Sequence, residues 1–199
     1  MKRLILASAS PRRTQILAQL GVDHEAMPAD IVERRDAGET PDAYVLRMAT
    51  CKASVIAKQL DDTGVVVLGA DTTVALGDTV FGKPANQQEG AAMLQQLGGR
   101  THRVLSAVAV LSRSQTRTKL VESSVTLRPI SASEAACYWA TGEPCDKAGG
   151  YAIQGKASAF VAAMTGSYSG VVGLPIFETL ALLAAANIAP QWLSGATCG

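Results

Sequence analysis

Two hydroxyl and two guanidinium groups lie close together near the N-terminus, at Ser8, Ser10, Arg12 and Arg13. They follow an apolar run at 4–7 that predicts a short buried strand, and a helix over 12–20 is expected to begin among them. A helix start carries partial positive charge, so two arginines in its first turn are unfavourable unless an anion binds there. A phosphate group would resolve this conflict, with the hydroxyls and guanidinium groups as its ligands. The alternative is that Ser10 only caps the helix and both arginines extend into solvent.

A carboxylate follows the next apolar stretch. Residues 64–70 predict a buried strand, and Asp71 comes directly after it. The C-terminal edge of such strands is where α/β proteins hold catalytic carboxylates and ligands. An ionised carboxylate there could hold a divalent metal ion or take a proton from an attacking water molecule. The structural alternative is an aspartate that caps the turn into a hairpin formed by 73–76 and 79–81.

Two lysines and a second acid are candidates for the same kind of site. Lys83 precedes a proline and offers a mobile charge suited to a phosphate oxygen. Lys52 lies on the helix expected over 41–60 and could add another cation to a polyphosphate site. Glu33 is a second possible metal ligand. For each of the three, a solvated surface charge is the alternative.

A glycine-rich loop in the last third of the chain combines a carboxylate, an ammonium and an amide. Asp146 and Lys147 precede two glycines that permit close backbone approach. Gln154 follows, and its side chain can donate and accept at once, which matches the carbonyl and N–H edge of uracil or thymine. The alternative for Gln154 is a surface amide without a partner. His102 has no serine or cysteine partner in view, so we interpret it as a positioning residue rather than an acid or base.

Composition limits the classes of partner. The 199 residues are 48% hydrophobic, enough for a buried core, and 18 basic against 17 acidic residues leave a formal charge of +1. Without a broad basic field, nucleic acid is not an expected partner, and any phosphate recognition must be local. No apolar run has the length of a membrane span, and the N-terminal apolar stretch is too short for a signal peptide, so a cytoplasmic location is expected. The four cysteines form no CxxC pair and are interpreted as reduced, structural thiols.

Helix and strand signals alternate along the chain, which favours an α/β fold with a mixed sheet. Further helices are expected over 87–97 and 132–140, and further strands over 101–111, 116–127 and 159–164. No linker or repeat divides the chain, so residues 1–199 are expected to form a single domain. The apolar helix expected over 174–187 should be buried nearly all round, although such a helix could equally serve a homodimer.

Taken in order, six motifs resemble those of one family, the Maf-like nucleoside triphosphate pyrophosphatases. The motifs are Ser8-Ala-Ser-Pro-Arg-Arg13, Gly69-Ala-Asp-Thr72, Gly82-Lys-Pro84, Asp146-Lys-Ala-Gly149, Ile153-Gln-Gly155 and Val171-Val-Gly-Leu-Pro175. Their order and spacing extend over nearly the whole chain. The resemblance implies a twisted mixed β-sheet with flanking helices that form two lobes around a central cleft, as in Maf and Ham1 proteins. It also implies cleavage of nucleotides between the α and β phosphates with a divalent metal ion.

The resemblance implies roles for individual residues as well. Asp71 corresponds to the family's proton acceptor and, with Glu33, to its metal ligands, where Mg²⁺ or Mn²⁺ would bind. The base-selecting positions of the family correspond to Arg12, Thr72 and Gln154. Its other contacts to phosphate and metal correspond to Ser8, Arg13, Lys52, Lys83, Asp146 and Lys147.

The branch of the family that acts on dTTP and UTP carries threonine and glutamine at selecting positions, together with Asp-Lys before Ala-Gly. This sequence has all of these residues, so the expected activity is hydrolysis of dTTP and UTP as house-cleaning of the nucleotide pool. Two alternatives remain, a pyrophosphatase for another non-standard nucleotide such as 7-methyl-GTP and a nucleotide-binding regulator of cell division and septum formation. One departure concerns the metal, because family members often carry a second acid beside Glu33, where this chain has Val32.

Overall fold

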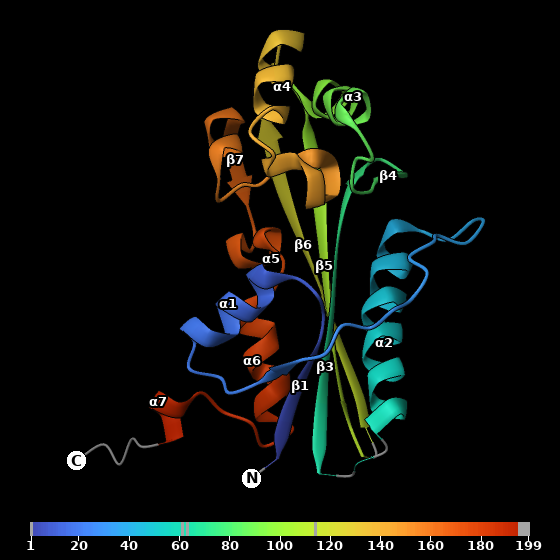
Figure 1. Ribbon diagram of the computed structural model, residues 1–199, viewed down its shortest axis with the longest axis vertical. Coiled ribbons are helices and arrows are strands. Elements are labelled where there is room, and N and C mark those ends of the chain that lie inside the picture. Colours follow the sequence, from blue (N-terminus) through green and yellow to red (C-terminus); the bar gives the residue numbers. More distant parts are fainter. Residues whose placement is uncertain (1, 61, 63, 114, 195–199) are drawn as a thin grey trace. The chain divides into compact units, whose positions relative to one another are not determined.

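A computed structural model describes residues 2–60, 62, 64–113 and 115–194. They form a mixed sheet with the strand order β2-β1-β3-β5-β6-β7, and β4 pairs with β3 (Figure 1). The strands are β1 (Arg3–Ala7), β2 (Glu25–Ala26), β3 (Val65–Leu76), β4 (Thr79–Phe81), β5 (Thr101–Ser112), β6 (Gln115–Leu127) and β7 (Val161–Thr165). The α-helices are α1 (Pro11–Gln19), α2 (Pro41–Leu60), α3 (Gln87–Leu97), α4 (Ala132–Trp139), α5 (Tyr168–Val172), α6 (Ile176–Ala184) and α7 (Gln191–Ser194), and the 3₁₀ helices are η1 (Glu143–Asp146), η2 (Ala148–Gly150) and η3 (Lys156–Phe160). The expected α/β fold with a mixed sheet is confirmed.

The chain divides into two compact units, each made of discontinuous segments. Unit 1 comprises Met1–Asp71, Ser106–Leu120 and Gly173–Gly199, and unit 2 comprises Thr72–Leu105 and Val121–Val172. Strands β3, β5 and β6 contribute residues to both units, because the boundaries fall within them. The single domain expected over 1–199 stays a prediction.

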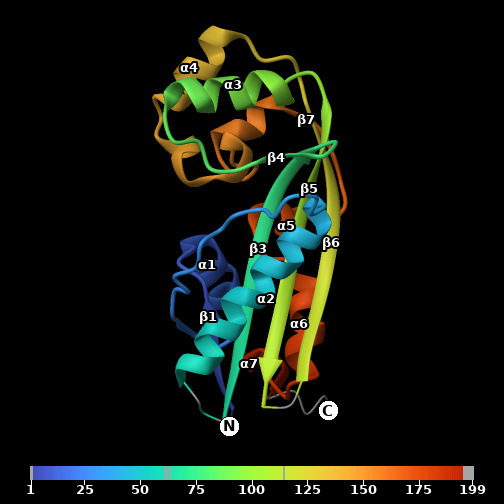
Figure 2. The ribbon, with the colours of Figure 1, turned by 90° about the vertical axis from the view of Figure 1, so that its right-hand side faces the viewer.

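Parallel strands and helices build unit 1. Strand β1 pairs in parallel with β2 and with β3, and Ile5 lies opposite Glu25 on one side and Val67 on the other. The apolar runs 4–7 and 65–68 are buried throughout, as expected for parallel strands that are covered on both faces. Helices α2 and α6 supply this cover from opposite faces (Figures 1 and 2).

Helix α2 packs against strand β3 in very close contact at Gly69. A Cβ atom on Gly69 would lie 2.2 Å from the carbonyl oxygen of Ala49 and 2.9 Å from the Cβ atom of Ala53. Both separations are far below van der Waals contact, so only glycine allows this approach. Lys52 lies on the same stretch of α2 and is thereby brought next to the strand that carries Asp71.

Unit 2 has a hydrophobic core of its own. Strand β4 pairs antiparallel with the end of β3, and β7 pairs antiparallel with the end of β6. Helices α3 and α4 pack against each other (Figure 2). Among the core residues are Val74, Phe81, Leu94, Leu97, Val104, Val125, Leu127, Tyr138, Tyr151 and Phe160.

The helix starts predicted in unit 2 are confirmed. Asn86 accepts a hydrogen bond from the backbone N–H of Glu89 at 3.0 Å where α3 begins. Ser131 and Glu134 form a reciprocal capping box at the start of α4. In unit 1, Ser10 precedes α1 as expected, but its side chain makes no capping hydrogen bond.

Three expectations about the elements are wrong. Strand β3 is continuous, so Asp71 lies within a strand rather than after one, because β3 continues to β4 after β1 has ended opposite Gly69. Helix α6 is not buried all round, since Phe177 is 80% exposed and only one face packs inward. The segment expected as a strand over 159–164 starts as η3, and β7 begins two residues later than expected. The homodimer stays a prediction.

The described residues contain no helix that is both long and apolar enough to cross a membrane. Cys51, Cys137 and Cys145 are free thiols, as expected, and Cys198 lies outside the described residues. Cys137 and Cys145 are exposed, so burial in a core does not account for either of them.

Candidate active site

Strand β1 leads into helix α1 through Ser8, which is buried. The hydroxyl oxygen of Ser8 accepts hydrogen bonds from the backbone N–H of Ser10 at 3.2 Å and from Nη1 of Arg13 at 3.0 Å. Arg13 is 8% exposed, and its Nε donates to the carbonyl oxygen of Gly173 at 2.8 Å. Because the Ser8 oxygen already accepts two hydrogen bonds, its proton is the group left to donate to an incoming anion.

Lys52 connects the two acids predicted to bind metal. Its Nζ lies 2.6 Å from Oδ1 of Asp71 and 2.8 Å from Oε1 of Glu33. Lys52 is 7% and Asp71 is 6% exposed, whereas the Glu33 side chain is 45% exposed. A buried carboxylate needs such a partner, because an unpaired charge inside a protein is costly. One ammonium group thus brings two carboxylates from distant segments to the same point.

The guanidinium group of Arg13 belongs to the same electrostatic cluster. Burial lowers the pKa of Arg13, Asp71 opposes this shift, Arg12 adds to it, and Glu33 opposes it. Within unit 1, Arg13 and Lys52 therefore both interact with the two carboxylates, and Arg12 adds a third basic group near Arg13. An excess of basic groups in a desolvated cluster favours the binding of an anion.

Tyr44 also belongs to this cluster, and no sequence motif predicted a role for it in the site. It is 8% exposed, and burial raises its pKa to about 12, with further contributions from the charges of Asp71 and Glu33. The phenol is therefore neutral at neutral pH. The signal that could have identified it is its spacing, because Tyr44 lies about two helical turns before Lys52 and shares its face of α2.

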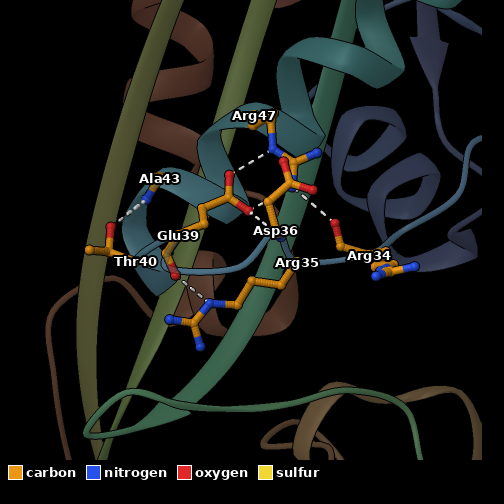
Figure 3. Close-up of polar contacts among 7 residues, drawn as sticks. All are labelled: Arg34, Arg35, Asp36, Glu39, Thr40, Ala43 and Arg47. Atoms are coloured by element: carbon orange, nitrogen blue, oxygen red, sulfur yellow. Dashed lines mark hydrogen bonds and ion pairs between the residues drawn. The ribbon is translucent and has the colours of Figure 1, made fainter.

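Arg47 on α2 holds the segment 34–39, which directly follows Glu33 (Figure 3). Its Nε and Nη2 each donate to the carboxylate of Glu39 at 2.6 Å, and Nη2 also donates to the carbonyl oxygen of Arg34 at 2.9 Å. The same Nη2 lies 3.5 Å from the carboxylate of Asp36. The hydrogen bond from Arg47 lowers the pKa of Glu39 to about 2, so the pair stays ionised at neutral pH. The residue that follows Glu33 is thereby tied to α2.

The carboxylates of Asp71 and Glu33 could hold a divalent cation. Both already reach one cationic group, the Lys52 ammonium. Magnesium commonly binds through one or two carboxylates and completes its shell with water and substrate phosphates. Within the described ranges, no three His, Cys, Asp or Glu side chains gather into a metal site. The oxygen donors present therefore fit a magnesium-type ion that shares its shell with substrate, and they do not fit a closed structural site.

The residues predicted to select the base lie in both units. Arg12 is half-buried in the first turn of α1 in unit 1. Thr72 is half-buried in β3, as the first residue of unit 2, and Gln154 is exposed before η3 in the same unit. Their role in selecting the base stays a prediction.

Lys83 and Lys147 lie on two loops of unit 2 that are joined through the backbone. The N–H of Gly149 donates to the carbonyl oxygen of Gly82 at 3.0 Å, and η2 packs against β4. Gly149 has φ 71°, a conformation that glycine adopts without strain. Lys83 is exposed, and the Lys147 ammonium is paired with the carboxylate of Asp146. The structure thus brings the two lysine-bearing loops together.

His102 lies on β5 and is 2% exposed. Its Nε2 is 2.7 Å from the hydroxyl of Tyr151, and the two rings meet edge to face with centroids 5.5 Å apart. Burial lowers the pKa of His102 to about 4, so the ring is neutral at neutral pH. His102 thus contacts Tyr151, which lies three residues before Gln154, and its interpretation as a positioning residue stays a prediction.

Known proteins match this chain over nearly its whole length. The model of a family described as Maf-like protein matches residues 3–186. A protein of Saccharophagus degradans named dTTP/UTP pyrophosphatase is 47% identical, over 95% of this chain and 90% of its own length. Proteins of the same name from Myxococcus xanthus and Cereibacter sphaeroides are each 50% identical, and the matches cover 95% and 93% of this chain and 95% of each relative. The solved structure of the Staphylococcus aureus Ham1 protein aligns with a TM-score of 0.44 and 15% identity, over 64% of this chain and 71% of that one.

Proposed function

Because the chain belongs to the Maf-like protein family, we propose that it hydrolyses dTTP and UTP to the nucleoside monophosphate and pyrophosphate. The observation that carries this proposal is its identity of 47–50% with relatives named dTTP/UTP pyrophosphatase, over at least 93% of this chain. The reaction would clear nucleotides from the cytoplasmic pool, with the nucleotide as the molecular partner.

The cationic cluster of unit 1 supports binding of the triphosphate. A nucleoside triphosphate carries about four negative charges, and attack on its α phosphorus requires that they be neutralised. Arg13 is held in place by Ser8 and Gly173, so its charge is oriented before the substrate arrives. Further phosphate ligands are proposed to be Ser8, Ser10, Lys52, Lys83 and Lys147, with Asp146 positioning the last of these.

Asp71 is proposed as the proton acceptor. Its carboxylate orients a water molecule for attack on the α phosphorus, in line with the oxygen that bridges to the β phosphate. The water oxygen forms a bond to the α phosphorus while the bond to the bridging oxygen breaks. One proton passes to Asp71, and pyrophosphate leaves with the electron pair of the broken bond. Lys52 holds the carboxylate in position through its contact of 2.6 Å.

Asp71 and Glu33 are proposed to hold Mg²⁺ or Mn²⁺, which would supply Lewis-acid stabilisation of the phosphate charge. Both are oxygen donors that already converge on one cationic group. Arg47 helps to keep the Glu33 carboxylate near Asp71, because it binds the backbone carbonyl of Arg34, the residue after Glu33, to α2.

Gln154 is proposed to select the base, together with Arg12 and Thr72. Its exposed amide offers one acceptor and one donor, which matches the N3–H and O4 groups of uracil and thymine. Cytosine presents a donor where uracil presents an acceptor, so an amide held in one orientation should reject it. A site built to hydrogen-bond one pattern discriminates strongly against another.

A panel of nucleotides tests the proposal. Pyrophosphate release would be measured for dTTP, UTP, CTP, GTP and 7-methyl-GTP, each with Mg²⁺, Mn²⁺ or a chelator. We expect turnover of dTTP and UTP that disappears with the chelator. A dominant activity on 7-methyl-GTP would make the chain a pyrophosphatase of another substrate class. Binding of dTTP without hydrolysis under any condition would instead favour a nucleotide-binding regulator of cell division.

A further inference from the structure

Gln154 lies at the centre of a backbone arch, residues 152–157, in unit 2. Within the arch, Gln154 and Lys156 are exposed, and the other residues are buried or half-buried. An exposed amide selects a base only if the backbone beneath it is held in one conformation, because binding energy is otherwise lost to ordering. The contacts that fix the backbone of the arch should therefore affect the selectivity for the base.

The carboxylate of Glu143 accepts hydrogen bonds from the far end of the arch. Its Oε2 accepts from the backbone N–H of Lys156 at 3.0 Å, and its Oε1 accepts from the N–H of Ala157 at 3.3 Å. Its Oε1 also accepts the hydroxyl proton of Tyr138 at 2.6 Å. Hydrogen bonds to a carboxylate are stronger than those between neutral groups, so these contacts fix the backbone after Gln154.

The hydroxyl of Tyr138 holds the near end of the arch. Its oxygen accepts a hydrogen bond from the backbone N–H of Ala152 at 3.1 Å. Tyr138 is 4% exposed, and its ring packs edge to face against Phe160 with centroids 5.5 Å apart. The Tyr138–Glu143 pair thus engages N–H groups two residues before and two residues after Gln154.

Gly155 allows the carboxylate to lie directly beneath the arch. A Cβ atom on Gly155 would lie 2.3 Å from Oε2 of Glu143. The backbone of Gly155 has φ −110°, which any residue can adopt, so this close contact and not backbone strain requires glycine.

The charge states of the pair suit this role. Burial opposes ionisation of Glu143, but the hydrogen bonds from Tyr138 and from the N–H groups of Lys156 and Ala157 outweigh it and lower its pKa. Burial, with the hydrogen bond to Glu143, raises the pKa of Tyr138 well above its usual range. At neutral pH the carboxylate therefore accepts and the phenol donates.

We propose that Glu143 and Tyr138 are positioning residues for base selection, because together they hold the arch that presents Gln154 to the pyrimidine. The inference rests on the proposed function, in which Gln154 contacts the base. Neither residue touches substrate, and both act through the backbone of the arch.

The test compares Glu143→Gln and Tyr138→Phe with the wild type. For each protein, kcat and KM would be measured with UTP and CTP. We expect the preference for UTP over CTP, as the ratio of kcat/KM values, to fall by about tenfold or more, since an unfixed amide discriminates poorly. We expect most of the loss to be in KM for UTP, with kcat changed by less than about threefold, because the phosphate-cleaving groups are untouched.

Glu134→Gln provides the matched control. Glu134 lies on the same helix as Tyr138, accepts a hydrogen bond from the backbone N–H of Ser131 at 2.8 Å and pairs with Arg128, and both of these partners lie outside the arch. This variant should lose comparable thermal stability and keep the wild-type preference for UTP. Amide hydrogen exchange at Ala152, Lys156 and Ala157 should become faster in the two test variants and not in the control.

A third substitution keeps the inference testable if a variant folds poorly. Gly155→Ala should reproduce the loss of discrimination, because its methyl group displaces the Glu143 carboxylate. In a Glu143→Ala background the same substitution should cost nothing further, which is the signature of one shared contact.

The outcomes separate the two claims. The inference would be overturned if both test variants cleaved UTP and kept the wild-type preference for UTP over CTP. It would also be overturned if Glu134→Gln lost this preference to the same extent. Neither result would affect the proposed function. Failure of the wild type to cleave dTTP or UTP would refute the proposed function, and the inference about base selection would fall with it. The loss of preference confined to the Tyr138, Glu143 and Gly155 variants would support both.

Discussion

At the scale of single residues, the buried pair of Asp71 and Lys52 is the centre of the candidate chemistry. The two side chains meet at 2.6 Å in a buried part of unit 1, where a carboxylate can orient a water molecule without competition from bulk solvent. Glu33 and Arg13 surround the pair and are held by contacts of their own. A change of one atom at Asp71 should therefore affect the reaction more than the fold.

We expect Asp71→Asn to lower pyrophosphate release from dTTP by about 100-fold or more, because an amide cannot take the proton of water. The circular dichroism spectrum should stay that of the wild type, since Lys52 keeps Glu33 as a partner. Asp78→Asn, in the exposed turn before β4, is the control and should retain full activity. Wild-type turnover in Asp71→Asn would remove Asp71 from its assigned role.

His102 should make the stability of the protein depend on pH. Its pKa is lowered from 6.5 to about 4, so between these values the unfolded chain binds a proton that the folded chain does not. The neutral His102 should contribute its full share to the free energy of unfolding above pH 6.5. This contribution should decrease as the pH falls toward 4, by at most about 1.4 kcal/mol per pH unit. Urea unfolding at a series of pH values would measure this slope.

His102→Gln should flatten that slope, whereas the same substitution at His24, the other histidine of the chain, should leave it in place. An unchanged slope in His102→Gln would show that other groups cause the acid sensitivity.

At the scale of elements, helix α2 organises unit 1. It packs on β3 at Gly69, carries Lys52 and Tyr44 toward Asp71, and anchors the preceding loop through Arg47 (Figure 3). The Arg47 guanidinium attaches the loop to the helix at Arg34 and Glu39, and the Lys52 ammonium attaches it at Glu33. The mobility of the loop should increase when the contacts of Arg47 are removed.

We expect Arg47→Met to expose the loop to trypsin, with cleavage after Arg34 and Arg35 severalfold faster than in the wild type, because local opening governs proteolysis. Arg47→Lys should have an intermediate rate, since lysine keeps the charge but not the two-pronged contact with Glu39. Arg117→Met, which removes an exposed arginine on β6, is the control. Equal cleavage rates in all four proteins would mean that the loop is held by other contacts.

At the scale of the whole molecule, strands β3, β5 and β6 run through both compact units. Unfolding of either unit would therefore disrupt strands that also belong to the other unit. The formal charge of +1 gives the chain no broad basic field, so phosphate recognition is expected to be local.

We expect the chain to unfold in one calorimetric transition. For 199 residues the unfolding enthalpy near 60 °C should be about 140 kcal/mol, and the van't Hoff value should equal it. A saturating, non-hydrolysed analogue of UTP should raise the transition temperature as a single event. Two transitions, each with a smaller enthalpy, would contradict the single domain expected over 1–199.

Local sequence was enough to predict the helix starts at Asn86 and Ser131, the long helix from Pro41, and the order of the family motifs. These features depend on hydrogen bonds and on periodicity among residues that are close together in the sequence, so a short stretch of sequence is enough to predict them. The residue types that suit phosphate and metal were visible for the same reason.

Contacts between distant segments could not be derived in this way. The bond from Arg13 to Gly173 joins residues 160 positions apart, and Lys52 meets Asp71 and Glu33 only because α2 packs on β3. The exposed Phe177 and the uninterrupted β3 likewise reflect which neighbours each element finds, and no propensity encodes this. Long-range packing sets the partners of a buried charge, and the partners set what that charge can do.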